Sequence, residues 1–293
     1  MKLEQVSNNC FAVLNEKNRV CDSNSGLINL GKGMVIDTQS DLSHARKMMG
    51  MLGKVWPAIP NRVVNTHEDA DHIYGNQLFD EAEIIGHRSL PERIKQVAEP
   101  EEFQHLMHLT ADPISGPQMK SVHPGVVAAV DQLREDYDFG GVKLVPPTTL
   151  FDDRLDVFLD DTKVEIIHVG PCHQVGDAIV WMPSEKVLFA GDILFRLCTP
   201  MGWVGTFNKW YETLDMIVEK LKPDVIVPGH GPVAVPDAAL FLACPGETRP
   251  GCTLPAISLV LRRSIPSLQP PGHSLKTQHS GIIHSQLTAH KCH

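Results

Sequence analysis

Short apolar segments alternate with polar turns through most of this chain, and their spacing predicts an α/β protein. Apolar segments bounded by Asn, Ser, Gly or Asp are typical of buried β-strands. In the N-terminal part such segments lie at residues 11–14, 25–30, 33–37, 61–65 and 83–86. Residues 41–52 differ, because their apolar side chains recur at helical spacing and Gly53 follows them, which predicts a helix. Alternating strands and helices are typical of sheets covered by helices.

Residues 89–140 interrupt this strand pattern. Five prolines punctuate the segment, and its second half carries apolar residues on one face of a helix. We therefore interpret 89–140 as two helical stretches inserted as a lid. Strands resume at about residue 155. Further elements are predicted as strands at 163–169, 177–182, 186–190 and 224–227, with a helix at 210–221.

Composition divides the 293 residues into two parts. All the predicted strands lie within residues 1–240, which are long enough to bury a large core. Residues 241–293 are rich in Pro, Ser and His and show weak periodicity. We expect one domain over 1–240, with its lid at 89–140, followed by a low-complexity, disordered tail over 241–293.

The charge of the chain limits its partners. The formal net charge is −9, and residues 241–293 hold one acidic and five basic residues, which leaves −13 on the rest. No basic field is available to hold phosphates, so we expect a small-molecule substrate and neither nucleic acid nor a membrane as partner. The chain shows no long apolar run, no secretory signal and no disulfide framework among its seven cysteines. A cytoplasmic location is expected.

Four polar clusters each follow a predicted strand. Strand ends in a sandwich lie on one rim, so these groups can converge although they are far apart in the sequence. Imidazoles and carboxylates in this combination suit one or two first-row metal ions. The candidate ligands of the four clusters are His67, Asp69, Asp71 and His72, then His173, then Asp192, and finally His230.

Together with the segment that ends in Asp37 and Thr38, these clusters resemble the metallo-β-lactamase superfamily in order and spacing. The resemblance covers roughly residues 5–235. It implies an αββα four-layer sandwich with a helical insertion and a site for two divalent ions, usually Zn²⁺, at the rim between two sheets. It also implies that Asp37 orients the metal loop by hydrogen bonds. The implied ligands are His67, Asp69 and His173 for the first ion, Asp71, His72 and His230 for the second, and Asp192 as the bridge.

Asp69 departs from the usual His-x-His-x-Asp-His pattern, which has a second histidine at its position. An aspartate can ligate through oxygen at about 2.0–2.2 Å. Its negative charge weakens the Lewis acidity of the bound ion, and oxygen in place of nitrogen shifts preference from Zn towards Mn or Fe. The alternative is that Asp69 points away and leaves the first site weak or empty.

The resemblance implies a metal-dependent hydrolase. A metal-bound hydroxide, oriented by the catalytic Asp71, would attack the carbonyl carbon of a thioester, lactone, ester or β-lactam-type bond. No Gly-x-Ser-x-Gly element is present, which disfavours a serine hydrolase. Two alternatives stay open: an iron-dependent oxidoreductase of the same fold, similar to persulfide dioxygenases, and a non-catalytic metal-binding module.

Other residues near these motifs have less specific interpretations. Cys172 is predicted to be a small buried residue rather than a nucleophile, and the three histidines of the lid are expected on its surface. For His87 and His168 a structural role is favoured over contact with substrate or ligands. Three further residues are candidates either for the apolar wall of the pocket or for the core: Phe195, Met201 and Trp203.

Overall fold

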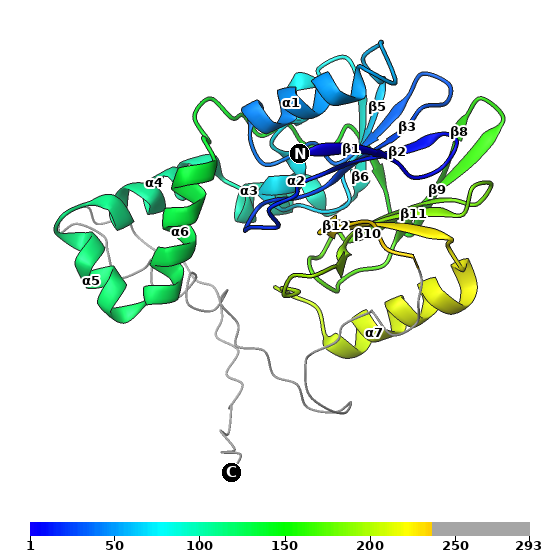
Figure 1. The fold of residues 1–293 in the computed structure, drawn as a ribbon. Coiled ribbons are helices and arrows are strands. Elements are labelled where there is room, and N and C mark those ends of the chain that lie inside the picture. Colours follow the sequence, from blue (N-terminus) through cyan, green and yellow to red (C-terminus); the bar gives the residue numbers. More distant parts are fainter. Residues whose placement is uncertain (236–293) are drawn as a thin grey trace. The chain divides into compact units, whose positions relative to one another are not determined.

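The computed structural model describes residues 1–235, in which two β-sheets lie between helices (Figure 1). The first sheet has seven strands in the order β1-β2-β3-β4-β5-β6-β7. Strands β1 to β4 pair antiparallel, and β4 to β7 pair parallel. The strands are β1 (Lys2–Gln5), β2 (Cys10–Leu14), β3 (Ser25–Ile28), β4 (Met34–Ile36), β5 (Arg62–Val64), β6 (Glu83–His87) and β7 (Thr149–Phe151).

The second sheet has five strands in the order β12-β11-β10-β9-β8. Strands β8 to β11 form an antiparallel meander, and β12 pairs parallel with β11. The strands are β8 (Arg154–Leu159), β9 (Thr162–His168), β10 (Ala178–Met182), β11 (Val187–Phe195) and β12 (Val225–His230).

Alternation along the strands builds the layers. In β2, Cys10, Ala12 and Leu14 belong to the core between the two sheets, whereas Phe11 and Val13 pack with buried residues of α1 (Leu42–Leu52). Buried residues of α7 (Phe207–Met216) pack in the same way against the outer face of the second sheet. Figure 1 shows the result, with α1 and α7 on opposite outer faces of the sheet pair. The αββα sandwich implied by the sequence is confirmed.

The predicted helix at 41–52 is confirmed as α1, and its start has a local cause. Asp41 precedes the helix in an extended conformation, and its carboxylate accepts a hydrogen bond of 2.7 Å from the backbone N–H of His44. This contact satisfies one of the N–H groups that a helix start leaves unpaired. Three short helical elements are α2 (Ala70–Ile73), a 3₁₀ turn (Asn76–Leu78) and a π-helical turn (Ile217–Leu221) that extends α7.

The lid segment contains four helices rather than the two predicted. Pro100 and Pro124 lie in the first turn of α4 and α6, where the missing N–H and the fixed φ of proline are compatible with a helix. These prolines therefore separate helices instead of marking loops. The helices are α3 (Leu90–Val97), α4 (Pro100–Ala111), α5 (Ser115–Val122) and α6 (Pro124–Asp136).

Two strands were missed by the sequence pattern, and two extend further than predicted. β1 is half exposed and mostly polar, and β7 has only three residues, so neither carries a clear apolar alternation. β11 extends to Phe195 and therefore contains Asp192, and β12 extends to His230; both residues were expected after the strand ends. Two register shifts between β11 and β12 allow the strand to continue past this polar residue.

The structure describes the expected domain of residues 1–240 as far as residue 235, and the expected tail at 241–293 lies outside the described residues. None of the helices in the described part of the chain has the length and hydrophobicity needed to cross a lipid bilayer.

Candidate metal centre

All seven predicted ligands meet at one rim of the sandwich. The loop after β5 and the short α2 supply four of them, which are His67, Asp69, Asp71 and His72. The loop after β9 supplies His173, β11 supplies Asp192 and the last residue of β12 is His230. Six of the seven residues are buried, and the Asp69 side chain is 18% exposed. Segments more than 160 residues apart in the sequence thus form one cluster.

Asp192 lies at the centre of this cluster. Its carboxylate oxygens lie 3.8 Å from His67 Nε2 and 3.2 Å from His72 Nε2. They also lie 3.3 Å from His173 Nε2 and 3.5 Å from His230 Nε2. A single carboxylate near all four imidazoles could contact two ions held by them.

The ligand atoms form three overlapping groups, each within a span that one ion could contact. In each group the candidate atoms lie within 4.8 Å of one another. Each group contains imidazole nitrogen and carboxylate oxygen, the donor types that first-row divalent ions accept. The groups are His67, Asp69 and His173; His67, His72 and Asp192; and Asp71, His72 and His230.

Hydrogen bonds fix which nitrogen of each imidazole faces the centre. His72 Nδ1 lies 2.8 Å from Asp37 Oδ2, so Nδ1 carries a hydrogen and Nε2 is the nitrogen that faces the centre. The Thr66 hydroxyl donates to the same Asp37 oxygen and therefore accepts from His67 Nδ1 at 3.0 Å. His67 Nε2 and His72 Nε2 are buried and have no hydrogen-bond partner. Two buried imidazole nitrogens without hydrogen-bond partners fit a bound cation.

Burial and opposite charges set the electrostatics of the centre. Burial lowers the pKa of His67 well below its ordinary value of 6.5. Burial acts in the same direction on His173 and His230, but Asp192 and the neighbouring carboxylates raise the pKa of these two residues to about 10 and about 9. The imidazoles in turn hold the pKa of Asp192 well below its ordinary value, although burial opposes this. Asp192 therefore stays ionised and requires positive charge beside it.

Asp69 faces the centre, not the solvent. Its Oδ2 atom lies 2.9 Å from His173 Nε2 and 3.9 Å from His67 Nε2. The structure therefore places an oxygen donor where the usual motif has an imidazole, and the alternative in which Asp69 points away is not observed.

Close backbone approach makes the rim compact. The backbone of Gly229 lies so near the Asp192 carboxylate that a Cβ atom at this position would overlap Asp192 Oδ1. A glycine is therefore required immediately before His230 if both side chains are to reach the centre.

Asp177 fixes the loop that carries His173, and sequence reasoning missed it. Its Oδ2 atom accepts backbone N–H groups from Cys172, His173 and Gln174 at 3.0, 2.7 and 2.9 Å. Cys172 is fully buried, as predicted.

The three residues predicted as an apolar wall or core contact the centre directly. The ring of Phe195 stacks on His230 with a centroid distance of 5.2 Å and an interplanar angle of 2°. The carbonyl oxygen of Met201 lies 2.6 Å from His173 Nδ1, which directs His173 Nε2 to the centre. The indole N–H of Trp203 donates to Asp69 Oδ2 at 3.1 Å. The polar contacts of Met201 and Trp203 were not predicted from the sequence.

The other histidines of residues 1–235 lie outside the three ligand groups. His87 and His168 stack on each other with a centroid distance of 3.8 Å and an interplanar angle of 8°, which joins β6 of one sheet to β9 of the other. His105 and His108 are exposed on α4, as expected of the lid.

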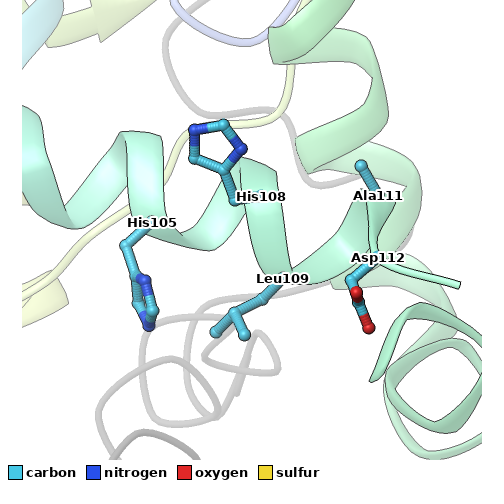
Figure 2. Close-up of a pocket in the computed structure, with 5 residues that line it drawn as sticks. All are labelled: His105, His108, Leu109, Ala111 and Asp112. Atoms are coloured by element: carbon cyan, nitrogen blue, oxygen red, sulfur yellow. The ribbon is translucent and has the colours of Figure 1, made fainter. Parts of the chain in front are cut away.

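A hollow of about 450 Å³ lies on the lid (Figure 2). Its lining residues all belong to α4 or follow it directly, so none of the candidate metal ligands contributes to it. The hollow contains no convergent carboxylate–imidazole set and is not a candidate active site. Figure 2 shows its lining residues, which are His105, His108, Leu109, Ala111 and Asp112.

Two facing sheets with helices outside and a buried His/Asp cluster at their rim define an αββα protein with a candidate dinuclear metal centre. Residues 18–230 match the family described as the Metallo-beta-lactamase superfamily. The chain therefore belongs to this superfamily, and membership supports a metal-dependent hydrolase in general terms.

A short part of the chain is similar to a curated enzyme. The "Metallo-beta-lactamase type 2" of Bacteroides fragilis is 33% identical over 85 residues, which are 28% of this chain and 34% of that enzyme. The chain thus matches about a third of the length of this relative.

Solved structures share the fold at low sequence identity. The metallo-β-lactamase from Pontibacter korlensis has a TM-score of 0.56 and 13% identity, with 80% of this chain and 93% of that chain covered. The sec-alkylsulfatase Pisa1 from Pseudomonas sp. has a TM-score of 0.57 and 18% identity, with 80% of this chain and 38% of that chain covered. These similarities show the sandwich fold alone.

Proposed function

We propose that this protein is a hydrolase that uses two divalent ions to cleave a thioester, lactone, ester or β-lactam-type carbonyl bond of a small molecule. One observation carries the proposal: four imidazole nitrogens and the carboxylate of Asp192 converge within 3.2–3.8 Å at the rim. Superfamily membership supports the same conclusion.

The proposed ligand sets follow the observed groups. His67, Asp69 and His173 would hold one ion, and Asp71, His72 and His230 would hold the other, with Asp192 contacting both. Zn²⁺ is the first choice because imidazoles dominate the donor set, and the oxygen of Asp69 also admits Mn or Fe. When bound, such ions supply an activated water and stabilise the oxyanion that forms on the carbonyl.

Asp71 is the proposed general base and general acid. Its side chain is 12% exposed, against 4% for Asp192, so it is the more accessible of these two carboxylates. One of its oxygens lies 3.3 Å from His230 Nε2, which fixes the side chain at the mouth of the centre. In this position Asp71 orients the attacking water, accepts its proton and passes the proton to the leaving group.

An aromatic side chain beside the centre supports a small organic substrate. The segment after Asp192 places the ring of Phe195 on His230. Apolar and aromatic side chains around a few polar groups are typical of small-molecule sites. The thioester, lactone or ester substrate is therefore expected to carry an apolar group.

A second candidate function follows from Asp69. His67, Asp69 and His173 make a set of two imidazoles and one carboxylate, which also binds non-haem Fe(II) in oxygenases. An iron-dependent oxidoreductase, similar to persulfide dioxygenases, is therefore the alternative.

The two candidates are separated by turnover assays on the protein loaded with Zn²⁺, Mn²⁺ or Fe²⁺. A panel of thioesters, lactones, esters, β-lactams and a secondary alkyl sulfate is assayed for hydrolysis, and oxygen uptake is recorded with a persulfide. The proposal predicts hydrolysis of a carbonyl substrate and a loss of about 10²–10⁴-fold in Asp71→Asn. Oxygen uptake by the iron form without any hydrolysis contradicts the proposal and supports the oxidoreductase. Ion binding with neither reaction contradicts both.

A further inference from the structure

Asp69 is surrounded by hydrogen-bond donors that come from outside the ligand groups. The side-chain amide of Gln174 donates to Asp69 Oδ1, and the indole N–H of Trp203 donates to Asp69 Oδ2 at 3.1 Å. Oδ2 is also the atom that faces His67 and His173. Both oxygens of this carboxylate are therefore held in place, one of them while it faces the imidazole nitrogens.

The donor character of both neighbours is fixed. An indole nitrogen can only donate. The amide of Gln174 could turn around, but its Oε1 atom accepts from the Arg93 guanidinium at 3.4 Å. Because a guanidinium has no acceptor, the oxygen of Gln174 must face Arg93 and the NH₂ group must face Asp69.

A buried ion pair holds Arg93 in this orientation. Its Nε atom lies 3.1 Å from Glu68 Oε1, and the Glu68 side chain is fully buried. The same carboxylate accepts the backbone N–H groups of Val175 and Gly176 at 3.2 and 3.0 Å. Arg93 belongs to α3, so this helix fixes both the loop of His67 and the loop of His173.

We propose that Gln174 and Trp203 are positioning residues that make position 69 specific for a carboxylate ligand. This inference rests on the proposed metal centre. An imidazole at position 69 would ligate through one nitrogen and carry an N–H on the other. That N–H would face the hydrogen-bond donors of Gln174 and Trp203. A carboxylate instead offers lone pairs that accept from these donors. The neighbours of position 69 therefore match an aspartate, and Asp69 is not merely a substitution of the histidine in the usual motif.

The inference is tested by exchanging donor and acceptor across the pair, with Zn²⁺ binding measured by competition against a chromophoric chelator. Asp69→His and Gln174→Glu are each expected to weaken binding of one ion by about 10–100-fold, the range for residues that orient ligands. The double variant Asp69→His/Gln174→Glu pairs an imidazole N–H with a carboxylate and is expected to bind that ion more tightly than Asp69→His alone. Such recovery measures a direct interaction between the two positions.

Trp203→Phe and Gln96→Glu complete the design. Trp203→Phe keeps an aromatic ring but removes the N–H, so it is expected to weaken the binding of one ion. Gln96 is exposed, and its Oε1 atom accepts a hydrogen bond from Arg93 Nη1 at 2.9 Å. Gln96→Glu therefore adds the same negative charge beside Arg93 as Gln174→Glu does, but leaves the contacts of Asp69 unchanged. This control is expected to bind Zn²⁺ as the wild type does.

The second ion reports on folding in every variant. Loss of one ion with retention of the other is expected, because Asp71, His72 and His230 do not contact Gln174 or Trp203. Variants Gln174→Glu and Trp203→Phe that bind both ions as tightly as the wild type overturn the inference and leave the proposed function standing. The same holds if Asp69→His binds as the wild type does. A wild type that binds no divalent ion overturns both.

Discussion

Hydrogen bonds to the ring nitrogens that face away from the centre orient the ligand imidazoles. The carboxylate of Asp37 bonds to His72 Nδ1, and the carbonyl of Met201 bonds to His173 Nδ1. Asp37 also accepts the backbone N–H of Thr66 at 2.8 Å, which fixes the start of the metal loop. These contacts select the nitrogen that faces the centre before any ion binds, which reduces the cost of ordering the ligands on binding.

Asp37→Ala is expected to lower the affinity for Zn²⁺ by about 10–100-fold, because His72 loses the partner that fixes its ring and its protonated nitrogen. The measurement is a competition titration with a chromophoric chelator. Asp41→Ala is the matched control, since Asp41 caps α1 through His44 and contacts no candidate ligand. Equal affinities in Asp37→Ala and the wild type would show that Asp37 does not orient His72.

At this scale the sequence predicted the candidate ligands but not their partners. The ligand types and their order along the chain are visible because they recur as a motif. Gln174, Trp203 and Asp177 act through contacts that depend on how loops fold back in three dimensions. Asp177 bonds to backbone groups three to five positions earlier, and Trp203 reaches across 134 residues to Asp69. No local pattern indicates the second kind of contact.

At the scale of elements, buried strands were predictable and exposed or very short ones were not. β2 and β10 are fully buried apolar runs, and both were predicted. β1 lies at the edge of its sheet, where one face is open to water and polar side chains are tolerated. The helices of the lid were underestimated because prolines at helix starts were interpreted as breaks.

The stacked pair of His87 and His168 gives the two sheets a pH-dependent contact. Burial first, and then the nearby His168, lowers the pKa of His87 from its ordinary 6.5 to about 4, although Asp152 opposes this. The unfolded chain therefore binds a proton near pH 6.5, while the folded chain keeps His87 neutral down to about pH 4. Since protons bind more readily to the unfolded state, this residue destabilises the fold as pH falls through that window.

His87→Phe keeps a ring in the stack and removes the titration. The urea midpoint of the wild type is expected to fall more between pH 7 and pH 5 than the midpoint of the variant. Because both proteins share every other titrating group, the difference between the two declines isolates His87. Identical declines would contradict this account of the stack.

At the scale of the whole molecule, the centre joins segments from both sheets, so ion binding is expected to stabilise the fold. Without the ions, only the surrounding imidazoles offset the charge of the buried Asp192. Ligand linkage at a free ion concentration of about 1,000 times the Kd corresponds to about 4 kcal/mol, or about 8–16 °C in melting temperature for a domain of this size.

This stabilisation is checked by thermal unfolding with Zn²⁺ and with a chelator in excess. The wild type is expected to melt at the lower temperature when chelated, and His230→Ala is expected to respond less. A melting temperature that chelation leaves unchanged contradicts the view that both sheets are linked through bound ions.

The whole fold was predictable because alternation, motif order and the superfamily resemblance agreed. The shape of the rim was less predictable from the sequence, because it depends on register shifts in β11 and on the close approach of Gly229 to Asp192. Hydrophobic periodicity reports which face of a strand is buried. It does not report where two paired strands slip past each other.

The central claim is that the seven rim residues form a two-ion centre, and the most direct test counts the ions. Each protein is saturated with Zn²⁺, freed of unbound ion by gel filtration and analysed for Zn per chain, with the exposed His105 as control site. The wild type and His105→Ala are predicted to retain about two ions per chain, and His72→Ala at most about one. A wild type that retains none, or His72→Ala that retains both, would contradict the account.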